Sequence, residues 1–213
     1  MRPREITAAA EAKFHDGVRQ ATEFFMGQAN VQRALDRLVE RLEALDLPYA
    51  IAGAMALNEY GYVRVTVDVD VVLTRKGLET FKQHWMGRGY LEKFPGSRGF
   101  RDTENNVKIA VLITGEYPGD GHPKPVSFPD PAEVSRQGAR GRYLPLERLI
   151  ELKIASGMSA PHRLRDLADV LEVIHILELP EDFAGRLDES ERPKYRELWQ
   201  AARDRPATDL DER

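Results

Sequence analysis

The chain has 213 residues, enough for one α/β domain with a helical addition at the usual size of roughly 100–200 residues per domain. Its 42% hydrophobic and 31% charged residues are typical of a folded globular protein and argue against a disordered or membrane class. The net charge of −4 argues against bulk DNA binding, and the lack of cysteine excludes disulfides, thiolate metal sites and cysteine nucleophiles.

The sequence divides into three predicted regions. These are a helical extension over residues 1–29, an α/β domain over 30–143 and a helical region over 144–213. No stretch of about 18 apolar residues occurs, and no apolar run follows the basic N-terminus, so we predict a cytoplasmic protein without a membrane partner. From Asn30, leucines recur at helical spacing, which predicts an amphipathic helix that ends before Pro48.

A short apolar strand, a turn and a small-residue helix follow this first helix. The strand is predicted over residues 49–52, the turn at Gly53, and the end of the helix near Gly61. The segment "RVTVDVDVVLT", residues 64–74, is then typical of a β-strand, although it carries two aspartates. This order of elements predicts a mixed α/β sheet.

Further strands and helices are predicted beyond this segment. We expect a helix over 77–85, a strand or loop over 87–94, and a buried strand within "NNVKIAVLIT", residues 105–114. Residues 115–133 hold five prolines and three glycines, which predicts a long loop that covers a cleft. The remainder is predicted to be helical, in three segments: 144–157, 161–179 and 191–204.

The two aspartates of the strand pattern lie two residues apart. Because side chains alternate along a strand, Thr66, Asp68 and Asp70 share one face. Two carboxylates about 7 Å apart along a strand can lean together onto one divalent cation. Without a cation their repulsion raises the pKa of one of them. The alternative is that both acids are solvated on the surface of an unrelated α/β fold.

The segment "IAGAMALNEYGYVRVTVDVDVVL" resembles the signature of the nucleotidyltransferase superfamily: an apolar strand, a small-residue turn, a short helix, and a strand with Arg-x-Thr-x-Asp-x-Asp. More narrowly, it is similar to the bacterial branch that contains the AbiEii-like toxins. That branch shares a later Lys…Arg-x-x-Asp-x-x-Asp pattern, matched here by Lys153, Arg163, Asp166 and Asp169. The resemblance covers roughly residues 31–178.

The resemblance implies a nucleotidyltransferase-like fold and the transfer of a nucleoside monophosphate from an NTP to RNA or protein, with Mg²⁺ or Mn²⁺ as cofactor. It also raises a toxin-like role with an antitoxin partner. It places catalytic and metal-binding roles on Asp68 and Asp70, and nucleotide contacts or support on Gly53, Ala54, Arg64, Thr66, Lys153 and Asp166. A Gly53 turn also favours close approach of a phosphate to the backbone. For Lys153 a second interpretation is open, an ion pair with Asp166 or Asp169.

Two positions depart from the pattern of this superfamily. Ala54 replaces a second glycine or a serine, and Ala110 stands where active relatives carry a third carboxylate. Side chains from flanking loops could replace that acid, and the candidates are Glu116, Asp120 and Asp102. The sequence therefore favours a nucleotidyltransferase but leaves a second hypothesis, a catalytically inactive module of the same fold that binds a nucleotide or a protein.

Overall fold

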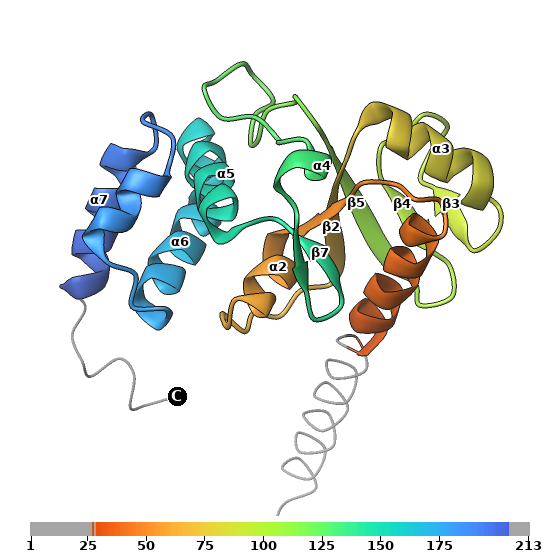
Figure 1. The fold of residues 1–213 in the computed structure, drawn as a ribbon, viewed down its shortest axis with the longest axis horizontal. Coiled ribbons are helices and arrows are strands. Elements are labelled where there is room, and N and C mark those ends of the chain that lie inside the picture. The colour runs from red at the N-terminus through yellow and green to blue at the C-terminus, as the bar shows by residue number, and fades with distance from the viewer. Residues whose placement is uncertain (1–26, 28, 205–213) are drawn as a thin grey trace, which may run out of the picture.

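A computed structural model of the chain describes residues 27 and 29–204. Within these residues the strands form one mixed seven-stranded sheet in the order β3-β4-β5-β2-β1-β7-β6 (Figure 1). The strands are β1 (Ala50–Ala52), β2 (Asp68–Leu73), β3 (Tyr90–Glu92), β4 (Phe100–Asp102), β5 (Val107–Ile113), β6 (Arg136–Gly138) and β7 (Gly141–Tyr143). β2 is central, antiparallel to β1 and parallel to β5. The predicted mixed sheet is confirmed.

Helices surround this sheet and continue beyond it. They are α2 (Gly53–Glu59), α3 (Arg75–Trp85), α4 (Pro131–Val134), α5 (Leu146–Ser159), α6 (Leu164–Ile176) and α7 (Arg192–Arg203), with 3₁₀ turns at Pro161–Arg163 and Glu181–Arg186. α5, α6 and α7 stand together on one side of the molecule and α3 on the other (Figure 1). The predicted helical region after the sheet is confirmed. Within the described residues, no helix combines the length and the apolarity needed to cross a bilayer.

The predicted first helix covers residues 29–43, and its leucine stripe is buried. Most of the predicted extension, residues 1–26 and 28, lies outside the described residues. The division at residues 29/30 and 143/144 stays a prediction.

The strand predicted over residues 64–74 is shorter in the structure and begins at Asp68. Residues before it have no partner strand, because β1 pairs only with 70–72 and β5 pairs from Lys108 onward. Val67 and Val63 are accordingly 79% and 85% exposed, whereas Val69 and Val71 are fully buried. The prediction of one continuous valine face was therefore wrong for residues 64–67.

Three strands and one short helix were missed. The strands are β4, β6 and β7, each only three residues long, and such short segments show no clear alternation. The helix is α4, at the end of the predicted loop 115–133. It begins with Pro131 in the first turn, where a proline is tolerated, and the side chain of Asp130 accepts a hydrogen bond from the backbone N–H of Ala132.

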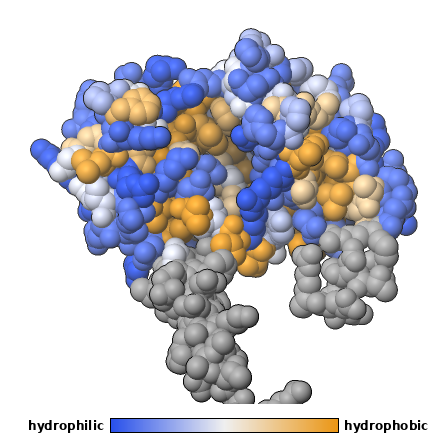
Figure 2. Space-filling model, turned by 180° about the vertical axis from the view of Figure 1, so that it is seen from behind, coloured by the Kyte–Doolittle hydropathy of each residue, from blue (hydrophilic) through white to orange (hydrophobic). Residues whose placement is uncertain are grey.

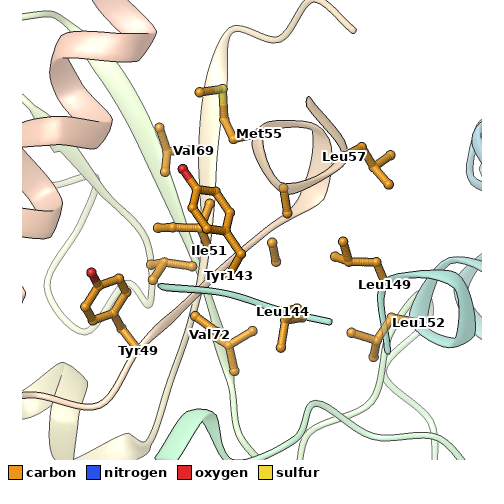
Figure 3. Close-up of a cluster of buried hydrophobic side chains, with 14 of the residues drawn as sticks. Tyr49, Ile51, Met55, Leu57, Val69, Val72, Tyr143, Leu144, Leu149 and Leu152 are labelled. Carbon is orange, nitrogen blue, oxygen red and sulfur yellow. The ribbon is translucent and has the colours of Figure 1, made fainter. Parts of the chain in front are cut away.

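The core connects the sheet to α2 and α5. Figure 3 shows buried side chains from β1, β2, β7, α2 and α5 packed in one cluster. In Figure 3 Leu144 lies between Val72 of β2 and the two leucines of α5, Leu149 and Leu152, which line the same cavity as Asp70. This packing fixes α5 beside the carboxylates. On the opposite side of the molecule from the view of Figure 1, separate hydrophobic patches alternate with hydrophilic surface (Figure 2).

Candidate active site

Asp68 and Asp70 lie on one face of β2, as the alternation predicts. Asp70 pairs in register with Ala52 of β1 on one side and with Ala110 of β5 on the other. These two small neighbours leave open space above Asp70, and the three residues line one cavity of about 1300 Å³. Asp70 is therefore directed toward a cavity and not toward an open surface.

Gly53 brings the backbone directly against the carboxylate of Asp70. A Cβ atom built on Gly53 would lie 2.0 Å from Oδ2 of Asp70, and the φ of Gly53 is +60°. Both the close contact and the left-handed backbone require glycine. The resemblance assigned Gly53 and Ala54 to the triphosphate. The structure places Gly53 in the cavity lining, whereas Ala54 is buried and is not part of that lining.

The carboxylate of Asp70 makes no hydrogen bond to any other residue that the structure describes. Burial, followed by the charge of Asp68, raises the pKa of Asp70 to about 6, against the smaller opposing effects of Lys153 and Lys108. This agrees with the repulsion that the sequence predicts for the two acids. At neutral pH the cavity floor therefore carries a poorly solvated negative charge, which a cation would stabilise.

Asp68 is held in place by the residue two positions before it. The hydroxyl of Thr66 donates to Oδ1 of Asp68 over 2.7 Å. The backbone of Arg64 is fixed by Asn58 of α2, whose side chain accepts from the N–H of Arg64 and donates to its carbonyl oxygen. The unpaired segment before β2 is thus ordered by side-chain hydrogen bonds. Within the described residues, the cavity lining includes Asp70 but not Asp68.

An ion network on α5 and α6 forms the wall of the cavity beside Asp70. Nζ of Lys153 lies 2.6 Å from Oδ2 of Asp169 and 3.2 Å from Oδ1 of Asp166. Arg64 also pairs with Asp169, which joins the segment before β2 to α6. The predicted ion pair of Lys153 is therefore confirmed, and its contact with a triphosphate stays a prediction.

Asp166 is ionised inside this network. Burial would raise its pKa, but the charge of Lys153 and hydrogen bonds from Ser156 and Lys153, together with the charge of Arg163, hold the pKa of Asp166 below its ordinary value. The hydroxyl of Ser156 donates to Oδ2 of Asp166 over 2.7 Å, and Nε of Arg163 donates to the same oxygen over 3.0 Å. Lys153, Ser156, Arg163 and Asp166 all line the cavity.

The position of the missing third carboxylate is now defined by strand register. Ala110 pairs directly with Asp70 across the parallel β2–β5 ladder, so a longer side chain there would reach the same face. Within the described residues, no group of three or more His, Asp or Glu side chains is arranged to hold a metal ion.

Of the three carboxylates considered as replacements, Asp102 was a wrong choice. It is fully buried in β4, accepts hydrogen bonds from Arg37 and Asn105, and is not part of the cavity lining. Glu116 and Asp120 do line the cavity. Both carboxylates form ion pairs with basic side chains: Glu116 with Arg75 and Arg98, and Asp120 with Lys124.

Several cavity residues were not found from the sequence. The most important is Lys108, which pairs in register with Asp68 and lines the cavity. Alternation along β5 could have found it, because Lys108 lies two residues before Ala110 and therefore shares its face. Ser156 could have been found from its position one helical turn after Lys153. The lining residues of β4, Phe100 and Arg101, lie on a strand that the sequence did not reveal.

No protein-family model matches this sequence, and no curated protein matches it. Among solved structures, the chain is similar to the solution structure of the antibiotic-resistance factor ANT(2'')-Ia, with a TM-score of 0.43, 14% identity, and coverage of 79% of this chain and 92% of that one. It is also similar to the crystal structure of ANT(2'')-Ia in complex with adenylyl-2''-tobramycin, with a TM-score of 0.44, 14% identity, and coverage of 78% and 97%. At this level of similarity the likeness assigns no activity to this chain.

Proposed function

We propose that this protein is a metal-dependent nucleotidyltransferase that moves a nucleoside monophosphate from an NTP to an acceptor, either RNA or protein. The observation that supports this most is the carboxylate of Asp70. It is poorly solvated, lacks a hydrogen-bond donor among the described residues, and lies beside Asp68 in a cavity of about 1300 Å³. A partly buried anion without a hydrogen-bond donor costs stability, so its presence at a cavity floor favours a functional role.

The donor set fits one divalent cation. Asp68 and Asp70 offer carboxylate oxygens on one strand face, and oxygen ligands are those that Mg²⁺ and Mn²⁺ prefer. When bound, such a cation would neutralise phosphate charge and polarise the phosphorus under attack. A second cation would require a third acid, and Ala110 stands in its place.

The chain's own residues have distinct tasks in this proposal. Lys153 places a positive charge on the cavity wall, held there by Asp166 and Asp169. Gly53 allows the carboxylate of Asp70 to lie against the backbone and fixes its position. The loop residues 115–121, several of which line the cavity, shield the reacting phosphate from water. The proposed toxin-like role and antitoxin partner rest on the sequence resemblance alone, and the proposed cytoplasmic location rests on the composition of the sequence.

The proposal is tested by labelling. The purified protein is incubated with each α-³²P-labelled NTP, Mg²⁺ or Mn²⁺, and total RNA or protein extract from a bacterium. We expect label on one acceptor class, with D70N and D68N transferring none. Label on RNA and label on protein distinguish the two acceptors. If wild type neither transfers label nor binds any NTP by calorimetry, the proposed function is wrong.

The second candidate is an inactive nucleotide-binding module, and the alanine opposite Asp70 favours it. In this case the wild-type protein binds an NTP with a divalent cation, D70N loses that binding, and no acceptor in either extract receives label. Calorimetry and labelling together therefore separate the two candidates.

A further inference from the structure

One row of side chains crosses the sheet beside the acid pair. Strand register places Leu91 of β3 opposite Arg101 of β4, Arg101 opposite Lys108 of β5, and Lys108 opposite Asp68 of β2. Two cations therefore stand side by side on the face that carries the two carboxylates. Like charges directly opposite each other in a sheet are destabilising unless an anion lies between or above them.

The two cations of this row differ in how they are held. Nη1 of Arg101 donates to the carbonyl oxygen and to Oδ1 of Asn106, over 2.8 and 3.0 Å, which directs the guanidinium toward the β4–β5 turn. Among the residues that the structure describes, Lys108 forms neither a hydrogen bond nor an ion pair. Its ammonium group, on an exposed and flexible stem, is thus free to meet an incoming ligand.

The other lysine near Asp70 already forms ion pairs. Lys153 is neutralised by Asp166 and Asp169, which lie 3.2 and 2.6 Å from its Nζ. Lys108 and Lys153 both line the cavity and approach Asp70 from different elements, the sheet and α5. Of the two lysines near Asp70, Lys108 is therefore the one that no carboxylate of the described residues contacts directly.

We propose that Lys108 is a phosphate-binding residue whose ammonium group contacts the triphosphate of a bound NTP and supplies positive charge where a two-metal site would place its second cation. This inference rests on the proposed function. It explains how a site with two carboxylates on β2, and Ala110 in place of a third acid on β5, can still compensate the charge of a triphosphate. Asp68 and Asp70 would hold one divalent cation, and Lys108 would add a positive charge beside it. Arg101 adds positive potential from the next strand.

The inference makes two opposite predictions for one substitution. K108M removes a cation beside the acid pair, so Mn²⁺ alone should bind about threefold more tightly, because a repulsive charge is lost. The same variant should bind Mn²⁺ with the α,β-methylene analogue of the preferred NTP about tenfold or more weakly, because a charge-assisted contact is lost. A lysine that does not contact the triphosphate would leave the affinity for the analogue unchanged.

The test measures both affinities by calorimetry for wild type, K108M, K108R, D70N and K76M. Lys76 lies exposed on α3 outside the cavity lining, so K76M has the same charge loss at a remote position. K108R should keep most of the analogue affinity, and K76M should match wild type. Thermal melts check folding, and K108Q repeats the charge loss if K108M fails to fold.

The outcomes separate this inference from the proposed function. If D70N abolishes analogue binding while K108M and K76M bind alike, the role of Lys108 is wrong and the nucleotide site survives. If wild type binds no analogue of any NTP, both the nucleotide site and the role of Lys108 are wrong. A loss of analogue affinity in K108M together with tighter Mn²⁺ binding supports the proposal.

Discussion

Replacing Gly53 by alanine tests the contact that fixes the candidate site. The added Cβ would lie 2.0 Å from Oδ2 and 2.9 Å from Cγ of Asp70, and the backbone φ of +60° is unfavourable for alanine. The left-handed backbone costs about 1–2 kcal/mol, and displacing the carboxylate adds about 1–3 kcal/mol, so we expect G53A to lose about 2–5 kcal/mol of unfolding free energy. Urea unfolding at neutral pH without metal measures this loss.

Gly87 provides a matched control for the backbone part of this cost. Its φ is +75°, and a Cβ there would meet nothing within 4 Å, so G87A should show the backbone cost alone. A double-mutant cycle isolates the clash, because D70A removes both Oδ2 and Cγ. When it is introduced into D70A, G53A should therefore cost only slightly more than G87A, because the 3.1 Å contact with the Cβ of residue 70 is all that remains of the clash. If G53A costs the same in wild type and in D70A, the reasoning about this contact is refuted.

Three further predictions concern the charges of the site. Burial and the charge of Asp68 raise the pKa of Asp70 from 3.8 to about 6. The folded state therefore binds the proton of this carboxyl group more tightly than the unfolded state does, and the wild-type protein loses stability as the pH rises from about 4 to about 6. D70N removes that loss. Its free energy of urea unfolding should exceed that of wild type by up to about 3 kcal/mol at about pH 7.5, but not at about pH 4. An equal difference at both pH values would contradict this prediction. A110D adds a third carboxylate opposite Asp70 and should raise Mn²⁺ affinity about tenfold or more, which calorimetry measures; unchanged affinity would show that this position does not face the metal. D169N removes the carboxylate that pairs with both Arg64 and Lys153 and leaves Lys153 its longer contact with Asp166, so it should cost about 3 kcal/mol in urea unfolding. D36N, in an exposed ion pair, should cost less than about 1 kcal/mol, and equal losses would refute a structural role of the network.

Local spacing alone was enough to predict the parts of the site that lie on one element. Alternation put Asp68 and Asp70 on one face of a strand, and the three-residue spacing put Asp166 and Asp169 on one face of a helix, within reach of Lys153. These predictions depend only on the period of a strand or a helix, which the covalent chain fixes.

The partners across elements were decided by tertiary structure. Asp102 illustrates this, because nothing local shows that it is buried against Arg37, 65 residues before it. The start of β2 at Asp68 depends on where β1 and β5 offer a partner.

By itself, the sequence determined the small-residue turn before the acid-bearing strand and the shared face of the two carboxylates. Only the tertiary structure placed Gly53 against Asp70, Ala110 opposite Asp70 and Lys108 opposite Asp68. The physical reason is that periodicity is a property of neighbouring residues, whereas strand register is set by the packing of segments that are far apart in the chain.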